Sequence, residues 1–439
     1  MAFLKKLLAF LSSFGFAAIL LVFLTLLTFL GTLEQVEHGL FETQKKYFES
    51  MFLVHWAGPI PIPLPGVYLL LSLLLLNLTC GGIVRMRKDL ARAGILVAHL
   101  GIVLMLVAGF VKYRFSVDGH LRLWPRDMSL ADYRLRYDPK ATAVPPTSGD
   151  EFQGYYDWEL SIREAVATGR TTEYLVPHTE WADALEKGPV TFTHDRLPFD
   201  VVVRRWMKNA QVVSDQTHPP MMRAEDTFPS VDGYVLWQQP LAVEAEANVA
   251  GLVATLREKA TGRMTTAQFW GLEFGGFTFE SGGKTWLLHL QHRRWKLPFA
   301  IALDKFTFET HPGISRAAVF LSDVTKTEDG AQQKSKITMN EPMRHKGFTL
   351  FQSGYGPPNV PVDWPHYSDF AVVSNPSDQW PKYSCFIIAA GLLFHFSMKL
   401  MKYVRSENRL ARPTVAARAA IGSADVEADE AFAAGSKKR

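Results

Sequence analysis

Four long apolar runs constrain the fold of this 439-residue chain more than any other feature of its sequence. They occupy residues 14–30, 66–84, 94–111 and 383–402. A helix needs roughly 20 mostly apolar residues to cross the hydrocarbon core of a bilayer, and each run approaches that length. The first run, which follows two lysines, also resembles the apolar core of a cleaved signal peptide. Because no small-x-small cleavage site follows it, we expect a retained helix and a membrane protein with four spans.

Basic residues near the ends of these runs predict the orientation of the spans, because cytoplasmic loops carry an excess of Lys and Arg. They form three groups, which are Lys5 and Lys6, then Arg85, Arg87, Lys88 and Arg92, then Lys402, Arg405 and Arg409. In a four-span topology all three groups lie on one side. We therefore expect both termini on the cytoplasmic side, with the loop 31–65 and the segment 112–382 on the outer side. All eleven tryptophans fall in these two outer segments.

The outer segment 112–382 has the pattern of a mainly β domain. The predicted strands lie within Phe299–Phe308, Asp200–Val203 and Arg316–Ser322, and a hairpin turns at Gly282–Gly283. Short strands separated by turn residues favour a sandwich or a barrel-like sheet over an α/β fold. We expect helix in short patches, such as Asp157–Val166. The final segment 403–439 is predicted to be a cytoplasmic tail, disordered from about Ala411 because Ala, Gly, Ser and charged residues dominate it.

Several function classes find no support in the sequence. The two cysteines, Cys80 and Cys385, both lie in apolar runs, so the outer domain has no thiol. The run Gly282–Thr285 resembles the end of a phosphate-binding loop, but the position of the required first glycine is Thr278. His289 and His292 are interpreted as surface histidines of a strand. The net charge of +4 is scattered and does not favour nucleic-acid binding, and nothing marks a hydrolase or a small-solute transporter.

Two histidines inside the apolar runs are the strongest candidates for a functional site, because ionisable residues within spans are rare and expensive. His99 lies five residues from Gly94, and His395 lies seven residues from Lys402. At the helical rise these separations place both imidazoles about 7–10 Å from the same side of the membrane. A neutral imidazole is a common axial ligand of haem iron. The alternative is that each ring only bonds a neighbouring helix. The glycines Gly94, Gly101 and Gly109 would let a helix or a porphyrin approach closely.

Short motifs in a fixed order resemble those of the ResB-like proteins of cytochrome c biogenesis system II, over nearly the whole chain. After the first run comes Gly31-Thr-Leu-Glu-Gln35, followed by Lys46-Tyr-Phe-Glu-Ser50 and Pro63-Leu-Pro-Gly66. The third run carries Val97-Ala-His-Leu-Gly101. Near the end of the outer domain stand Met339-Asn-Glu-Pro342 and Gly347-Phe-Thr-Leu-Phe-Gln-Ser-Gly-Tyr355.

The resemblance implies a subunit of a haem exporter and cytochrome c synthase in a bacterial inner membrane, with the large domain periplasmic. Such proteins pair with a CcsA- or ResC-type membrane protein that has a Trp-rich haem-handling loop. The complex joins haem b, bound transiently, to Cys-x-x-Cys-His of apocytochromes c. The third-span histidine of the family is an axial ligand of the membrane haem, which implies that role for His99. The second ligand is expected from the partner, which leaves His395 as a weaker candidate. The chain has no Trp-x-Trp-Asp motif, so we do not expect it to catalyse ligation alone. The outer domain would dock the apocytochrome or a thiol reductant, or support the partner's loop.

Two alternatives remain open. In the first, the chain is a non-catalytic scaffold for cytochrome or respiratory-complex assembly, and His99 only packs. Retained cytochrome c maturation in a deletion strain would favour it. In the second, the chain is a haem- or quinone-linked oxidoreductase subunit. Respiratory genes beside its own, in place of a CcsA-type gene, would indicate that function.

Overall fold

The computed structural model describes residues 2–141, 143–166, 171–216, 230–273, 275–310, 317–357, 360–361 and 364–410. The chain divides into two compact units. One unit contains residues 1–24, 69–110 and 377–439, and the other contains residues 25–68 and 111–376. The tail predicted to be disordered from Ala411 lies outside the described residues.

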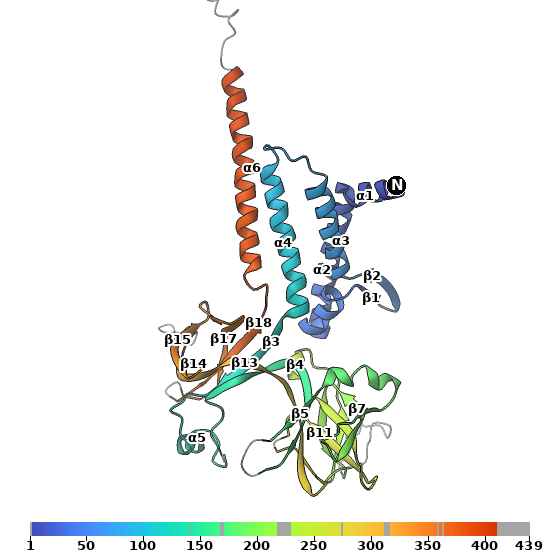
Figure 1. Ribbon diagram of the computed structural model, residues 1–439, viewed down its shortest axis with the longest axis vertical. Coiled ribbons are helices and arrows are strands. Elements are labelled where there is room, and N and C mark those ends of the chain that lie inside the picture. The colour runs from blue at the N-terminus through green and yellow to red at the C-terminus, as the bar shows by residue number, and fades with distance from the viewer. Residues whose placement is uncertain are drawn as a thin grey trace, which may run out of the picture. The chain divides into compact units, whose positions relative to one another are not determined.

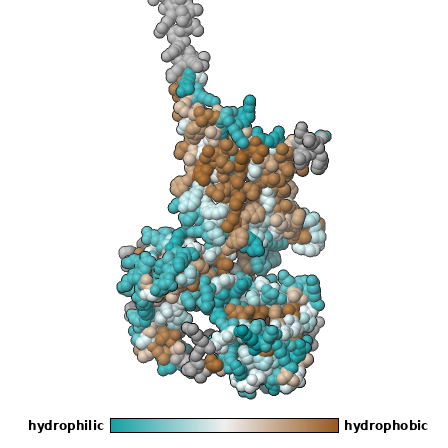
Figure 2. All heavy atoms as spheres, in the orientation of Figure 1, coloured by the Kyte–Doolittle hydropathy of each residue, from teal (hydrophilic) through white to brown (hydrophobic). Residues whose placement is uncertain are grey.

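Within the described residues, four helices are long and apolar enough to cross a membrane (Figure 1), and their apolar surfaces stand out in Figure 2. They cover Phe14–Phe48, Val67–Val84, Ala93–Phe115 and Trp380–Glu407. Two of them end in π-helical turns. The helical elements of the apolar segments are α1 (Ala2–Leu11), α2 (Phe14–Thr43), η1 (Gln44–Phe48), α3 (Val67–Asn77), η2 (Leu78–Val84), α4 (Ala93–Phe115) and α6 (Trp380–Leu410).

The first long helix extends well beyond the predicted span and folds back on itself. Gly39 interrupts α2 with φ 75° and ψ 167°, a conformation that side chains other than glycine rarely adopt. A Cβ at Gly39 would also lie 1.7 Å from the carbonyl oxygen of Val243. Beyond this kink the chain returns, so that Phe48 reaches Gly31, where an added Cβ would lie 3.1 Å from the Phe48 ring. The segment 31–65, expected as an outer loop, is therefore helix followed by a hairpin of two strands.

The remaining described chain is mostly β. Its short helices are α5 (Leu130–Arg136), η3 (His178–Glu180), η4 (Ala184–Lys187) and η6 (Ala245–Ala247). Its strands are β1 (Phe52–Ala57), β2 (Ile60–Pro65), β3 (Val117–Leu123), β4 (Ser148–Glu164), β5 (Glu173–Pro177), β6 (Val190–Phe192), β7 (Phe199–Met207), β8 (Ala210–Ser214), β9 (Tyr234–Gln238), β10 (Gly251–Glu258), β11 (Met264–Trp270), β12 (Phe277–Ser281), β13 (Lys284–Thr310), β14 (Ala317–Glu328), β15 (Ala331–Thr338), β16 (Met343–His345), β17 (Phe348–Gly356) and β18 (Tyr367–Ser374).

One ten-stranded antiparallel sheet dominates the outer domain. Its main path runs β15-β14-β13-β4-β3-β18-β17-β16, with β12 beside β13 and β5 beside β4. Because β15 also contacts β16 and β17, the sheet curls until it nearly closes into a barrel. A four-stranded sheet, β11-β10-β7-β6, and the two hairpins β1-β2 and β8-β9 complete the described strands. The predicted fold class, four apolar helices with a large mainly β domain, is thus confirmed, and of the two sheet forms the barrel-like one is present.

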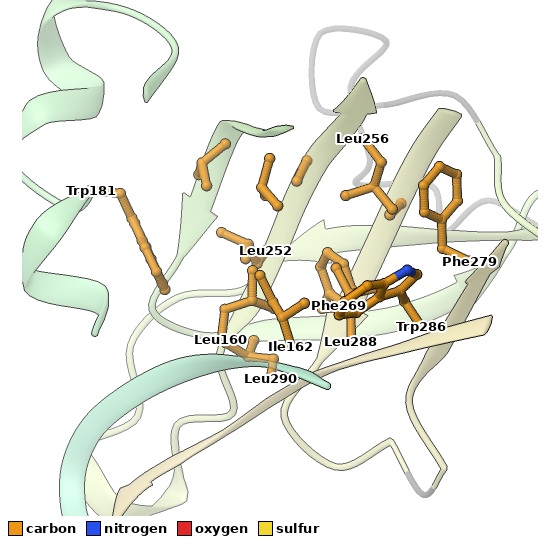
Figure 3. Packing of buried hydrophobic residues seen from close by; sticks show 14 of the residues in the cluster. Leu160, Ile162, Trp181, Leu252, Leu256, Phe269, Phe279, Trp286, Leu288 and Leu290 are labelled. Carbon is orange, nitrogen blue, oxygen red and sulfur yellow. The ribbon is translucent and has the colours of Figure 1, made fainter. Parts of the chain in front are cut away.

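The two longest strands, β4 and β13, join two hydrophobic cores. Leu160 and Ile162 of β4 pack with Trp286, Leu288 and Leu290 of β13 against the four-stranded sheet (Figure 3). Trp158 of β4 belongs to the same cluster. The other ends of the same strands fill the barrel-like core, with Phe152 from β4 and the run from Leu297 to Leu303 from β13. β4 and β13 pair beside both cores, with register shifts between His292 and Arg294 and between Lys296 and Ile301. These two strands therefore connect the two cores of the outer domain.

The helix predicted over Asp157–Val166 is wrong, because this segment lies in β4 up to Glu164. Trp158, Leu160 and Ile162 alternate along one face of the strand and are at most 5% exposed. Glu159 and Ser161, on the opposite face, are each 2% exposed. A strand buried on both faces loses the simple alternation that marks a half-buried one, and cross-strand packing overrides the local helix preference of Glu and Arg.

The other strand predictions are confirmed over the described residues. Asp200–Val203 lies in β7, Phe299–Phe308 lies in β13, and the described part of Arg316–Ser322 lies in β14. The predicted hairpin joins β12 to β13 at Gly282 and Gly283, whose φ angles are 61° and 72°. Two consecutive positive φ angles are typical of a type I′ turn, which favours glycine. A strand follows the turn, in agreement with the rejection of a phosphate-binding loop.

Candidate functional site

His99 lies on α4 and is oriented by the neighbouring span. Its Nδ1 lies 3.1 Å from the carbonyl oxygen of Gly82 in the π-helical end of the second span. Because a carbonyl oxygen only accepts hydrogen bonds, Nδ1 carries the hydrogen and donates it. In the neutral ring Nε2 then keeps its lone pair. The last carbonyls of a helix have no partner within that helix, so this bond also satisfies an otherwise open acceptor.

Gly82 permits the close approach of the imidazole. A Cβ at this position would lie 2.6 Å from His99 Nδ1 and 2.9 Å from Leu78 Cδ1. Any side chain at residue 82 would therefore force the ring to move. The sequence offered no signal for this contact, because the two residues are 17 positions apart.

The small residues of α4 face α6. A Cβ at Gly94 would lie 2.5 Å from the Gly391 carbonyl oxygen, and one at Gly101 would lie 2.7 Å from Ile388. Ala98, between these two glycines, is 5% exposed. Close backbone approach at small residues is the usual packing of membrane helices. The sequence left open whether a helix or a porphyrin packs against these glycines. In the structure, helix α6 packs against Gly94 and Gly101. An added Cβ at Gly109 would have no atom within 4 Å.

His395 lies beside this helix contact, and its surroundings differ from those of His99. A Cβ at Gly94 would lie 2.9 Å from His395 Cβ, which places His395 about 7 Å along α4 from His99 at the helical rise. Its Nδ1 is buried and has no hydrogen-bond partner within the described residues. The role of His395 as a second candidate ligand stays a prediction.

The donor set fits one axial bond to a haem iron. A metal-ligating histidine usually donates its other ring N–H to a carbonyl or a carboxylate, which fixes the tautomer and the ring orientation. His99 has this arrangement, with Nδ1 bound to Gly82 and Nε2 left as the donor for iron. The same hydrogen bond also satisfies the packing alternative. The geometry is thus compatible with both roles, and ligation remains a prediction.

A polar cluster around the buried Tyr47, just after the first apolar run, was not predicted. Glu34 accepts hydrogen bonds from Lys46 Nζ at 2.5 Å and from the Tyr47 hydroxyl at 2.5 Å. His55 Nδ1 lies 2.6 Å from the same hydroxyl oxygen. Since the Tyr47 proton goes to Glu34, His55 donates from Nδ1, and the cluster fixes the orientation of its ring. Glu34, Lys46 and Tyr47 belong to the motifs that follow the first apolar run. These motifs were the sequence signal that could have indicated the cluster.

The outer domain contains a second group of histidines, between β3, β4 and β13. The His292 ring stacks on Trp158 with ring centroids 3.9 Å apart, and His120 lies 6.4 Å from His292. Each has a buried Nδ1 without a hydrogen-bond partner within the described residues. Burial, and then the nearby His120, lower the pKa of His292 to about 4. The interpretation of His292 as a surface histidine is therefore wrong, because Trp158 covers its ring. His289 is only half-buried and bonds the Glu273 carbonyl at 3.0 Å.

Aromatic side chains line a cavity of about 410 Å³ in the same domain. Phe41 of α2 stacks on Tyr156 of β4 with ring centroids 3.7 Å apart, and Lys45 Nζ lies 4.3 Å from the centre of the Phe41 ring. The other aromatic residues of the lining are Tyr155, Trp158, His178 and Trp206. The lining also contains charged side chains of both signs, which are Glu42, Lys45, Asp157, Asp183 and Lys208.

The last quoted motif forms strands around a buried polar network. Lys346 and Gly347 adopt positive φ angles in the turn between β16 and β17. Gln352 of β17 accepts hydrogen bonds through Oε1 from Ser322 at 2.6 Å and from Ser368 at 3.0 Å. These contacts satisfy polar groups inside the barrel-like sheet, next to a register irregularity in β17. In the structure this motif thus links the paired strands β17 and β18 to β14 through side-chain hydrogen bonds.

Comparison with known proteins identifies a family that matches part of the chain. The model of the ResB-like family matches residues 280–365, which run from the end of β12 to the segment before β18. Both motifs quoted from the end of the outer domain lie inside this range. No curated protein matches the chain.

Proposed function

We propose that this chain, as a ResB-like protein, is one subunit of a membrane complex. The complex exports haem and attaches it to apocytochromes c. The family match supports involvement in cytochrome c biogenesis at the family level. The observation that carries the finer proposal is the imidazole of His99. It lies within an apolar helix, with Nδ1 bound to the Gly82 carbonyl and Nε2 left to bind iron.

In this proposal His99 provides one axial ligand while haem is the cargo of the complex. The other ligand comes from a CcsA- or ResC-type partner with a Trp-rich loop. Attachment then needs no redox co-reactant, because each thiol of Cys-x-x-Cys-His adds its S–H across one vinyl group and forms a thioether. This chain orients the cargo and supports the partner. The outer domain docks the apocytochrome or a thiol reductant, or braces the partner's loop.

The proposed orientation has both termini in the cytoplasm. Contacts within the helical unit support it, because they place the basic groups that flank the spans at one end of this unit. Asn77 donates to the carbonyl oxygens of Leu11 and Ser13 at 2.6 and 3.0 Å. Arg85 donates to the Ser12 hydroxyl. These bonds hold α1 beside the basic loop that follows the second span. Because His395 packs at Gly94, the basic end of α6 extends from the same end of α4.

Complementation of a deletion strain tests this function. We expect loss of the chain to abolish covalent haem attachment to cytochromes c, as seen by haem staining. Wild-type protein should restore staining, His99→Ala should restore at most a small fraction of it, and His395→Ala should restore most of it. The full chain should also co-purify with a CcsA-type protein. Normal staining without the chain would support the scaffold alternative and contradict the proposal.

A further inference from the structure

The hairpin β1-β2 begins and ends at the boundary of the apolar spans. Gly31 follows the first apolar run, and the Phe48 ring packs against it just before β1. At the other end of the hairpin, Gly66 donates its N–H to the Met51 carbonyl at 2.7 Å, and α3 starts at Val67. The base of the hairpin is therefore level with the end of one span and the start of the next.

The two faces of the hairpin differ sharply. Directly opposed residues of an antiparallel pair lie on the same face. On the inner face Leu53 is 7% exposed, and His55 bonds to Tyr47. On the outer face Phe52 is 74%, Val54 45% and Trp56 59% exposed. Opposite them stand Pro65, Pro63 and Pro61. The outer face is thus entirely apolar, and the polar cluster at Tyr47 lies on the opposite face of the hairpin.

The prolines also remove donors from the free edge of β2. Proline has no N–H, so the N–H groups that β2 donates to the ladder belong to Ile60, Ile62 and Leu64. The outward positions of β2 are Pro61, Pro63 and Pro65, so this edge has no N–H group to be satisfied. Such an edge is compatible with a poorly hydrated layer and unsuited to pairing with another strand.

We propose that the outer face of this hairpin is a lipid-binding surface, which lies in the boundary between phospholipid headgroups and acyl chains. Three observations indicate lipid as the partner of this face. They are the position of the hairpin base at the ends of two spans, the exposed apolar side chains, and the edge of β2 without N–H donors. Tryptophan and phenylalanine are suited to this layer, where Trp56 keeps its indole N–H in the wetter part. The inference rests on the membrane-spanning helices and does not depend on haem handling.

Site-specific fluorescence in lipid nanodiscs tests the proposal with the full chain. In a Cys80→Ser, Cys385→Ser background, Trp56→Cys is labelled with an environment-sensitive fluorophore. Met264→Cys on β11 is the matched control, because Met264 is 64% exposed and lies in the outer domain. Val54→Cys, on the same face as Trp56, serves if the first variant folds poorly. We expect a blue shift and a loss of emission with doxyl-labelled lipids at residue 56, and neither change at residue 264.

Two results would overturn the proposal. Emission at residue 56 that matches the control in wavelength and in quenching would place the face in water. A blue shift without quenching by doxyl lipids would indicate that protein covers the face. Both outcomes would leave the haem-handling function untouched, since His99 is not altered in these variants.

Discussion

At the scale of single residues, one backbone carbonyl decides what the His99 imidazole can do. Gly82 takes the Nδ1 hydrogen and leaves Nε2 as a ligand, whereas the buried Nδ1 of His395 has no partner within the described residues. The sequence could indicate His99, because an imidazole in an apolar run is unusual. It could not indicate Gly82, because the contact depends on the packing of two spans and on a π-helical turn.

Gly82→Ala should weaken haem retention by the complex about 10–100-fold, the usual effect of altering the group that orients a metal-ligating histidine. The added Cβ would lie 2.6 Å from Nδ1, so the ring must turn away from its position. Haem content per purified complex is the measurement. Gly109→Ala is the matched control, because its Cβ would meet no atom within 4 Å. Equal haem content in both variants would argue against an oriented ligand.

At the scale of elements, the contact between α4 and α6 depends on glycine. Gly94→Leu should destabilise the protein by about 1–3 kcal/mol, because its Cβ would meet backbone atoms of α6 that cannot move independently. Thermal unfolding in nanodiscs should show a lower midpoint for this variant than for the wild type. Gly109→Leu, on the same helix, should change the midpoint little. Similar midpoints for the two variants would contradict the proposed packing.

The sequence predicted those elements whose pattern is local, and missed those set by distant contacts. The four apolar helices and the glycine turn at Gly282–Gly283 follow from composition and turn chemistry. The strand at Trp158–Ile162 was mistaken for helix because pairing with β13 buries both of its faces. The kink at Gly39 was missed because a carbonyl about 200 residues further along the chain, that of Val243, makes glycine necessary there.

At the scale of the whole molecule, the outer domain should lose stability as the pH falls from about 6.5 towards 4. The folded-state pKa of His292 is about 4, below its usual value of 6.5, because burial disfavours the charged ring. Between these values the unfolded chain binds a proton that the folded domain does not, so stability decreases on acidification by up to roughly 3 kcal/mol. Denaturant unfolding at pH 7 and pH 5 measures the change.

His292→Phe should remove much of this pH dependence, because phenylalanine keeps the stacking on Trp158 and does not titrate. His194→Phe, at an exposed turn, is the control and should retain it. An unchanged pH dependence in His292→Phe would show that other groups cause the acid sensitivity.

The central claim is that His99 binds iron, and imidazole rescue tests it most directly. The full chain carrying His99→Gly is purified with its CcsA-type partner, and absorption spectra are recorded with and without added imidazole. We predict that the low-spin bis-histidine haem signal is lost in this variant and restored by imidazole, while His395→Gly keeps the signal throughout. A bis-histidine signal that persists in His99→Gly without imidazole would contradict the account.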